Sequence, residues 1–196
     1  MPCPTPFIIP LIFPLLIFVV VIFIAIMADT KQKEALKKLS AYLPGTMTKF
    51  SLAPTYTGDY QGLKFYIVIA PGGKNSPPHL QIWLVKNVNF RLRIYKENIL
   101  SLWAEKIGLV REVKTGDPAF DGEFLIFSSK DQQAMMYLSN ASNKENIRKI
   151  FNYGFSSLVA GSQRVIIQKV YSSDMDLAPD KIVDIVQTLN LITRGL

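Results

Sequence analysis

The chain is poor in the residues that build metal sites and covalent cross-links. Among its 196 residues there is one cysteine, Cys3, and one histidine, His79. One cysteine cannot form a disulfide framework, and the two residues together cannot supply a Cys-rich or multi-histidine zinc site. The sequence therefore predicts a fold held by its apolar core, with no metal ligands and no cofactor.

Charge is missing from the first 28 residues, so all 22 Lys and Arg and all 15 Asp and Glu lie from Asp29 onward. The apolar run from Phe7 to Ala28, as one helix, would span about 33 Å, against roughly 30 Å of bilayer hydrocarbon. Pro10 and Pro14 would kink or fray this helix. No basic residue precedes the run and it is too long for a cleaved signal peptide. We therefore predict an N-terminal transmembrane anchor over residues 1–28.

The lysines that follow this run set its expected orientation. Lys31, Lys37 and Lys38 lie shortly after Ala28, whereas no basic residue precedes Phe7. The positive-inside rule then places the C-terminal part of the chain in the cytoplasm. The predicted location is the cell membrane, with a single pass and a cytoplasmic soluble domain.

Residues 29–45 are predicted to form a basic, amphipathic juxtamembrane helix. Ala35, Leu36 and Leu39 recur at helical spacing, and Pro44 with Gly45 ends the pattern. The helix could lie on anionic lipid with its lysines near the head groups. Alternatively, Leu36 and Leu39 pack on the following domain and the lysines are solvated. The sequence leaves both interpretations open.

Residues 46–196 are predicted to form a soluble α+β domain. Runs of apolar or alternating residues predict strands at 63–70, 79–85, 90–95, 123–128, 155–160 and 164–171. Helical spacing predicts helices over 130–139, from a capping box at Ser142 to about Gly154, and from Pro179 onward. Strands mostly precede helices through short connections, which favours a mostly antiparallel sheet covered by helices. The predicted fold class is thus α+β, with an N-terminal transmembrane helix followed by this domain.

One segment resembles a known group of proteins. It lies within residues 106–138 and carries a Gly-Asp-Pro-x-Phe-Asp-x-x-Phe pattern, formed by Gly116, Asp117, Pro118, Phe120, Asp121 and Phe124. This pattern is similar to one in uncharacterised bacterial proteins, many of them membrane-anchored. The resemblance implies a bacterial origin and a shared fold, and it implies no activity.

The same segment holds the strongest candidates for chemistry. Asp117 and Asp121 could act as acid and base or bind a hard cation, with His79 as a further titratable group. Turn chemistry gives a simpler interpretation, because an Asp before Pro118 bonds the turn backbone. We therefore predict no catalytic residue, and keep an enzyme or small-ligand domain that uses the Asp117/Asp121 loop as the alternative.

Basic side chains give the remaining signal. In the strand at 90–95, Arg91 and Arg93 alternate with apolar residues and should face outward. Further cations, Lys144, Arg148 and Lys149, lie on a predicted helix. We predict contacts with an anionic surface at Lys31, Lys37, Lys38, Arg91 and Arg93.

The predicted function is a membrane-tethered, non-catalytic domain that acts by interaction. The expected partner is the lipid bilayer, and a protein partner is left open. No nucleic-acid signature accompanies the charge, so no nucleic acid is expected. The sequence does not predict an oligomeric state.

Overall fold

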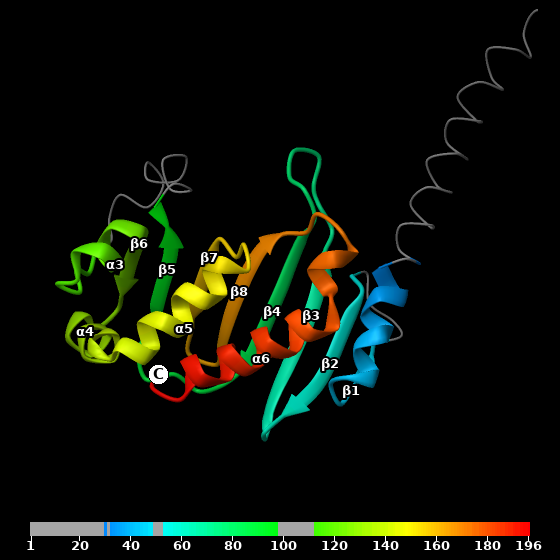
Figure 1. Ribbon diagram of the computed structural model, residues 1–196, viewed down its shortest axis with the longest axis horizontal. Coiled ribbons are helices and arrows are strands. Elements are labelled where there is room, and N and C mark those ends of the chain that lie inside the picture. Colours follow the sequence, from blue (N-terminus) through cyan, green and yellow to red (C-terminus); the bar gives the residue numbers. More distant parts are fainter. Residues whose placement is uncertain (1–29, 31, 49–52, 98–111) are drawn as a thin grey trace, which may run out of the picture.

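The computed structural model describes residues 30, 32–48, 53–97 and 112–196 (Figure 1). Their strands form one eight-stranded sheet in the order β1-β2-β3-β4-β8-β7-β5-β6. Every neighbouring pair is antiparallel. The strands are β1 (Gly45–Met47), β2 (Thr55–Tyr60), β3 (Leu63–Ala70), β4 (His79–Val85), β5 (Leu92–Lys96), β6 (Phe124–Ser128), β7 (Ser157–Ala160) and β8 (Arg164–Val170).

The helices pack on one face of this sheet, and α5 and α6 cross in front of it in Figure 1. Their buried side chains and those of the facing strands form one hydrophobic core cluster. Residues 32–38 are also helical and belong to this layer. The named helices are η1 (Leu39–Ala41), α3 (Pro118–Glu123), α4 (Asp131–Ser139), α5 (Ala141–Asn152), η3 (Asp174–Leu177) and α6 (Pro179–Thr193).

The other face of the sheet, which we call the open face, has a different character. Successive side chains of a strand point to opposite faces, so the residue after a core residue points to the open face. Ile82 is fully buried in the core, and the next residue, Trp83, is half-buried. Val68 and Phe127 are buried on their strands but lie outside the core cluster. The open face is therefore partly apolar although it does not contribute to the core.

The α+β class and the antiparallel sheet agree with the sequence prediction, but the fold class needs one correction. Among the helices of the described residues, none has the length and apolar composition needed to cross a bilayer. The longest named helix, α6, has 15 residues and carries Asp180 and Asp184, and such a helix spans only about 22 Å. The predicted transmembrane segment, residues 7–28, lies outside the described residues.

The helix at residues 32–38 packs on the domain. Leu36 and Leu39 are fully buried in the same core cluster as the sheet residues. The Tyr56 hydroxyl on β2 donates a hydrogen bond of 2.6 Å to the carbonyl of Leu43 and ties the following turn to the sheet. Of the two interpretations left open by the sequence, the structure shows this packing. The division at residues 28 and 45 stays a prediction.

Two local predictions differ from the structure. Residues 115–122, which the sequence predicts as a turn, overlap the short helix α3, which runs from Pro118 to Glu123. Helix α5 begins with Asn140 as its N-cap, whose side chain accepts a hydrogen bond from the Ser142 backbone N–H, so the predicted capping box at Ser142 is wrong. Asn and Ser are about equally good N-caps, and sequence alone does not choose between neighbours of this kind.

Candidate functional site

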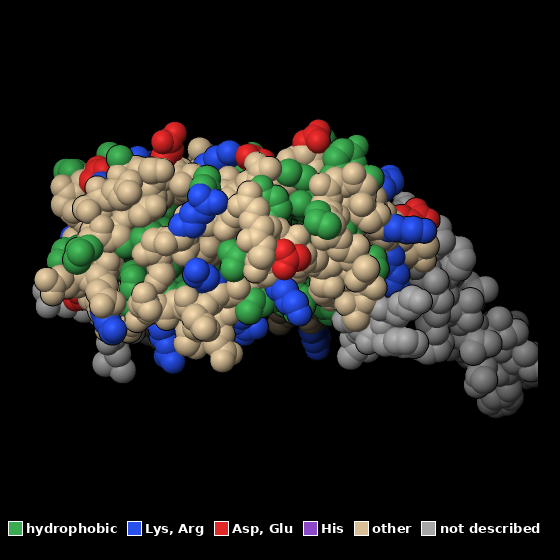
Figure 2. Space-filling model, turned by 90° about the horizontal axis from the view of Figure 1, so that it is seen from below, with side chains coloured by type: hydrophobic (Ala, Val, Ile, Leu, Met, Phe, Trp, Pro, Cys, Tyr) green, Lys and Arg blue, Asp and Glu red, His purple; other side chains and the backbone are tan. Residues whose placement is uncertain are grey.

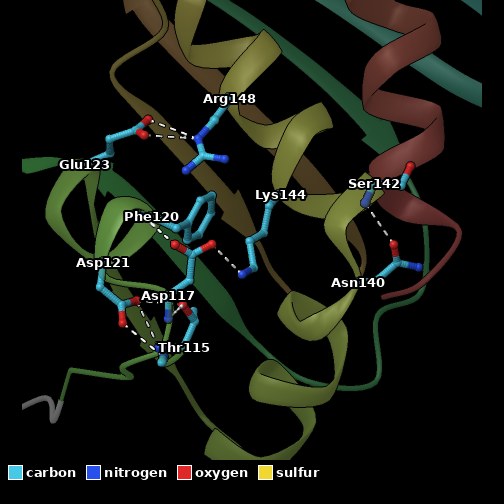
Figure 3. A network of polar contacts seen from close by, with 10 residues as sticks. Thr115, Asp117, Phe120, Asp121, Glu123, Asn140, Ser142, Lys144 and Arg148 are labelled. Carbon is cyan, nitrogen blue, oxygen red and sulfur yellow. Dashed lines mark hydrogen bonds and ion pairs between the residues drawn. The ribbon is translucent and has the colours of Figure 1, made fainter.

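The carboxylates of the Asp117/Asp121 loop bind backbone and side-chain groups of the loop itself and, at Asp117, Lys144 of α5 (Figure 3). The Phe120 backbone N–H donates to Asp117 at 3.2 Å, which makes Asp117 the N-cap of α3. The Lys144 ammonium donates to the other oxygen at 2.7 Å. The hydrogen bond from Lys144 and then the one from Phe120 hold the pKa of Asp117 below its ordinary value. Asp121 accepts hydrogen bonds from the Thr115 backbone N–H at 2.9 Å and from the Thr115 hydroxyl at 2.8 Å.

Aromatic packing completes this loop and fixes α3 against α5. The ring centroids of Phe120 and Phe124 are 4.8 Å apart, and those of Phe124 and Phe151 are 4.7 Å apart. Arg148 of α5 pairs with Glu123 of α3 at 3.0 Å, as Figure 3 shows. The Asp117–Lys144 and Glu123–Arg148 pairs thus hold α3 against α5, and Asp121 holds the loop before α3. This geometry supports the turn interpretation over the enzyme alternative.

His79 does not join the two carboxylates. It begins β4, whereas α3 and its aspartates adjoin β6, and strands β8, β7 and β5 lie between β4 and β6 in the sheet. The main hollows of the described structure are not lined by Asp117, Asp121 or His79. Across the described ranges, no three His, Cys, Asp or Glu side chains gather as metal ligands. The three side chains that the enzyme alternative would use are therefore not brought together in the described residues.

The basic residues separate into two groups. On the helix side, Lys144, Arg148 and Lys149 are ion-paired with Asp117, Glu123 and Asp184, respectively. Arg91 and Arg93 are exposed, and within the described chain neither guanidinium forms an ion pair. The charge of the helix cations is thus largely neutralised locally, and that of the two arginines is not.

Arg93 belongs to a row of directly opposed side chains that runs across the open face. In strand order, each member faces the next as a cross-strand neighbour: Tyr66, Trp83, Ile166, Val159, Arg93 and Phe127. The Tyr66 and Trp83 rings stack with centroids 5.2 Å apart and planes 15° apart. We call this set the open-face row. It places an aromatic pair and two aliphatic side chains next to Arg93, which forms no ion pair with the described residues.

A hollow of about 720 Å³ lies over the row and extends to the turn between β7 and β8. Arg91, Arg93 and Arg164 line it, and none of its lining residues is acidic. We call it the arginine hollow; its remaining lining residues are Tyr66, Trp83, Val85, Val159, Ala160, Gly161, Ser162, Gln163 and Ile166. In Figure 2, Lys and Arg project along the lower edge, on the open-face side, whereas the upper edge carries most of the Asp and Glu together with further Lys and Arg.

The structure does not join all five predicted anionic-surface residues. Lys31 lies outside the described residues. Lys37 and Lys38 are exposed on the helix at residues 32–38, and Lys38 lines a separate hollow beside Asp174 and Pro179. Only Arg91 and Arg93 lie together in the arginine hollow. Contact of any of the five with an anionic surface stays a prediction.

Of the residues that line the hollow, the sequence indicated only Arg91 and Arg93, and Tyr66, Trp83 and Arg164 are among those that it missed. The alternation of the 79–85 strand already separates Trp83 from Ile82 and Leu84, so its outward direction was available from the sequence. Its neighbours were not available, because they depend on strand register between distant segments.

Comparison with known proteins adds a fold relationship. No protein-family model matches the chain, and no curated protein matches it. The fold is similar to the crystal structure of the mycobacterial trehalose monomycolate transport factor A, TtfA, with a TM-score of 0.55. The match has 11% sequence identity and covers 86% of this chain and 95% of that chain. At this identity the similarity shows a shared fold, and the resemblance of the Gly116–Phe124 segment to bacterial membrane-anchored proteins stays a prediction.

Proposed function

We propose that this domain is a non-catalytic interaction domain that docks on an anionic membrane surface through its open face, within a membrane-associated transport process. One observation carries the proposal. The arginine hollow combines three guanidinium groups that have no ion-pair partner in the described chain with a row of half-buried apolar side chains. On the helix side, the cations Lys144, Arg148 and Lys149 are each ion-paired with a carboxylate.

Membrane physics supports this orientation. Each exposed Arg near an anionic leaflet contributes roughly 1 kcal/mol of attraction, and aromatic side chains favour the interface between head groups and hydrocarbon. Arg91 and Arg93 lie in the same hollow as Trp83. The acidic side chains gathered mainly on the opposite side in Figure 2 would be repelled by the same surface. Both effects turn the open face toward the lipid.

The transport part of the proposal rests on the structural neighbour. TtfA is named as a transport factor for trehalose monomycolate. A shared fold supports a related setting but does not transfer a site or a substrate. We therefore carry over only participation in a membrane-associated transport process.

Photo-crosslinking in the intact chain tests this proposal. A benzophenone side chain replaces Val85, which lines the arginine hollow and is 43% exposed, or Met136, which lies on α4 and is 70% exposed. In native membranes we expect light-dependent adducts with anionic phospholipid at Val85 and much weaker ones at Met136. Equal yields at both positions would overturn the proposal. A protein adduct found only at Val85 would show that the open face binds a protein partner and not the membrane.

A pair of matched double variants shows whether the arginines are responsible. Arg91→Ser with Arg93→Ser removes two charges from the hollow, and Lys74→Ser with Lys130→Ser removes two exposed charges that do not line it. Both should leave the free energy of unfolding within about 0.5 kcal/mol, as surface changes usually do. Only the first should reduce the Val85 lipid adduct, about tenfold. An undiminished adduct in the arginine variant would contradict the assigned role of Arg91 and Arg93.

A further inference from the structure

We propose that the arginine hollow binds one molecule of an anionic amphiphile, a phosphate-type head group with an acyl chain. This inference rests on the proposed function and deepens it, because it replaces contact with a lipid surface by capture of a single lipid. The head group lies among Arg91, Arg93 and Arg164, and the acyl chain lies along Trp83 and its neighbours in the open-face row.

The size and lining of the hollow fit such a ligand. Its volume of about 720 Å³ lies within the range of about 300–1,000 Å³ that is usual for small-molecule sites. Its floor contains Trp83, Ile166 and Val159, which are consecutive members of the open-face row. Arg93 is the cross-strand neighbour of Val159, and Arg164 precedes Ile166 by two residues on β8. Cations that border an apolar floor suit a ligand with a charged head group and an apolar chain.

The charge of the hollow selects the head group. Three guanidinium groups line it without a carboxylate among the lining residues. A guanidinium presents a planar fork of N–H donors that matches two oxygens of a phosphate, and it stays charged at all physiological pH values. A phosphate-type head group would therefore complete hydrogen bonds that the described chain leaves unmade at Arg91, Arg93 and Arg164.

An extended acidic peptide fits less well than an acyl chain. Peptides that bind sheets usually add a strand at an edge, where backbone groups are free. The floor strands β4, β8 and β7 are each paired on both sides, so the hollow offers an incoming peptide side chains only. An acyl chain has no backbone donors or acceptors to satisfy, and it loses nothing on such a floor.

Single-stranded nucleic acid also fits less well. Bases bind sheet surfaces by stacking on free aromatic ring faces. The Tyr66 and Trp83 rings stack on each other at a centroid distance of 5.2 Å, so each covers one face of the other. The aliphatic neighbours Ile166 and Val159 continue the row and offer apolar contact without a ring.

Three water-soluble probes separate head-group binding from chain binding. The full chain, held in a non-ionic polymer, is titrated with octyl phosphate, octyl glucoside and inorganic phosphate by calorimetry. We expect octyl phosphate to bind at least about tenfold more tightly than either other probe, because each buried methylene contributes about a fourfold gain in affinity. Equal affinity for octyl phosphate and inorganic phosphate would overturn the inference, and so would equal affinity for octyl phosphate and octyl glucoside.

Variants and a quenching probe locate the two ends of the ligand. Arg93→Ala with Arg164→Ala should weaken octyl phosphate binding about tenfold or more, and Lys74→Ser with Lys130→Ser should change it less than about twofold. Octyl phosphate brominated at the chain end should quench tryptophan fluorescence, and Trp83→Phe, which keeps an aromatic stack, should remove that quenching. Quenching that persists in Trp83→Phe would place the chain elsewhere and overturn the inference.

The outcome can be told apart from that of the proposed function. If the Val85 crosslink to membrane lipid stands but octyl phosphate gains nothing over inorganic phosphate, surface docking survives and single-lipid capture fails. A short polyglutamate peptide that displaces octyl phosphate at equal concentration would overturn the inference in favour of an acidic protein partner.

Discussion

The ammonium of Lys169 on β8 lies 2.6 Å from a carboxylate oxygen of Asp176 in η3, and both side chains are buried. The Ser172 backbone N–H and hydroxyl donate to the second oxygen of Asp176, each at 2.9 Å. Lys169 also donates to the Tyr153 carbonyl at 3.1 Å. This pair joins the end of β8 to the segment that leads into α6, and each charge depends on the other for its solvation.

Removing one partner should therefore be costly. Asp176→Asn keeps an acceptor for Ser172 but leaves the Lys169 charge buried without its counter-ion, and we expect a loss of about 3–5 kcal/mol in the free energy of unfolding. The matched control is Glu112→Gln, which breaks the exposed Lys114–Glu112 pair and should cost less than about 1 kcal/mol. Urea denaturation of both variants measures the difference. Similar small losses in both would show that Lys169 is solvated without Asp176.

The same pair predicts a dependence of stability on acid. Burial by itself raises the pKa of Asp176, but the hydrogen bonds from Lys169 and Ser172 outweigh it and lower this pKa from 3.8 to about 2. A carboxyl with a depressed folded pKa stabilises the fold above its unfolded pKa and loses that contribution as the pH falls. We expect about 2 kcal/mol to be lost between pH 4 and pH 2. Thermal melts of the native chain and of Asp176→Asn should show this loss in the native chain only.

The aromatic packing of the Asp117/Asp121 loop should matter more than its charges. Phe120→Ala and Phe124→Ala should each lower the free energy of unfolding by about 3–5 kcal/mol, because both rings are essentially fully buried. Asp117→Asn should cost less than about 1 kcal/mol, since an Asn side chain still caps α3. Equilibrium denaturation measures all three. If Asp117→Asn lowered the free energy of unfolding more than the Phe variants do, the interpretation of this loop as a purely structural turn would be wrong.

Backbone conformation at the end of α5 gives an independent test. Gly154 follows this helix with a φ of +84°, in the left-handed region that side chains disfavour. Gly154→Ala should therefore destabilise the fold by about 1 kcal/mol. Gly122 in α3 has open space where a Cβ would lie and an ordinary φ, so Gly122→Ala should be neutral or slightly stabilising. Equal melting temperatures for the two variants would contradict this assignment.

The Tyr66–Trp83 stack should contribute a measurable pairwise energy. In a double-mutant cycle with alanine at both positions we expect a coupling of about 0.5–1.5 kcal/mol, typical of a stacked aromatic pair. A coupling near zero would show that the two rings do not interact in solution. The Tyr66–Trp83 stack would then not be a fixed part of the arginine hollow.

Local pattern was enough to predict much of the fold. Strands β3 and β4 match the predicted ranges residue for residue, and α6 starts at Pro179 as predicted. In these segments the apolar period and the flanking Pro and Gly residues agree with each other. Strand β2 was missed because TYTGDY contains Gly and Asp, which are depleted in strands, and it is held by pairing with β3.

The candidate site was much less predictable. The outward direction of Arg91 and Arg93 followed from alternation, and both are exposed. That Arg164 lies in the same hollow follows only from the pairing of β5 with β7 and of β7 with β8. Likewise, Lys144 and Arg93 are both basic residues on predicted elements, but the structure pairs Lys144 with Asp117 from another element. Sequence gives charges, and only tertiary structure shows which of them are neutralised.

The strand order also divides the sheet into two ribbons with different folding demands. Strands β1 to β4 are neighbours both in sequence and in the sheet, whereas β8, β7, β5 and β6 form the second ribbon. The ribbons meet only between β4 and β8, where Gln81 and Gln168, 87 positions apart, share a hydrogen bond of 3.3 Å. Closing so long a loop is slow compared with forming hairpins, so this seam should form late in folding and open early in unfolding.

Trp83 and Ile166 face each other directly across that seam, and both line the arginine hollow. A ligand that lies along Trp83 and Ile166 therefore contacts both ribbons at once and opposes their separation. Binding of such a ligand to the arginine hollow should therefore slow unfolding and lengthen the lifetime of the folded state. The unfolding rate then reports whether the hollow is occupied.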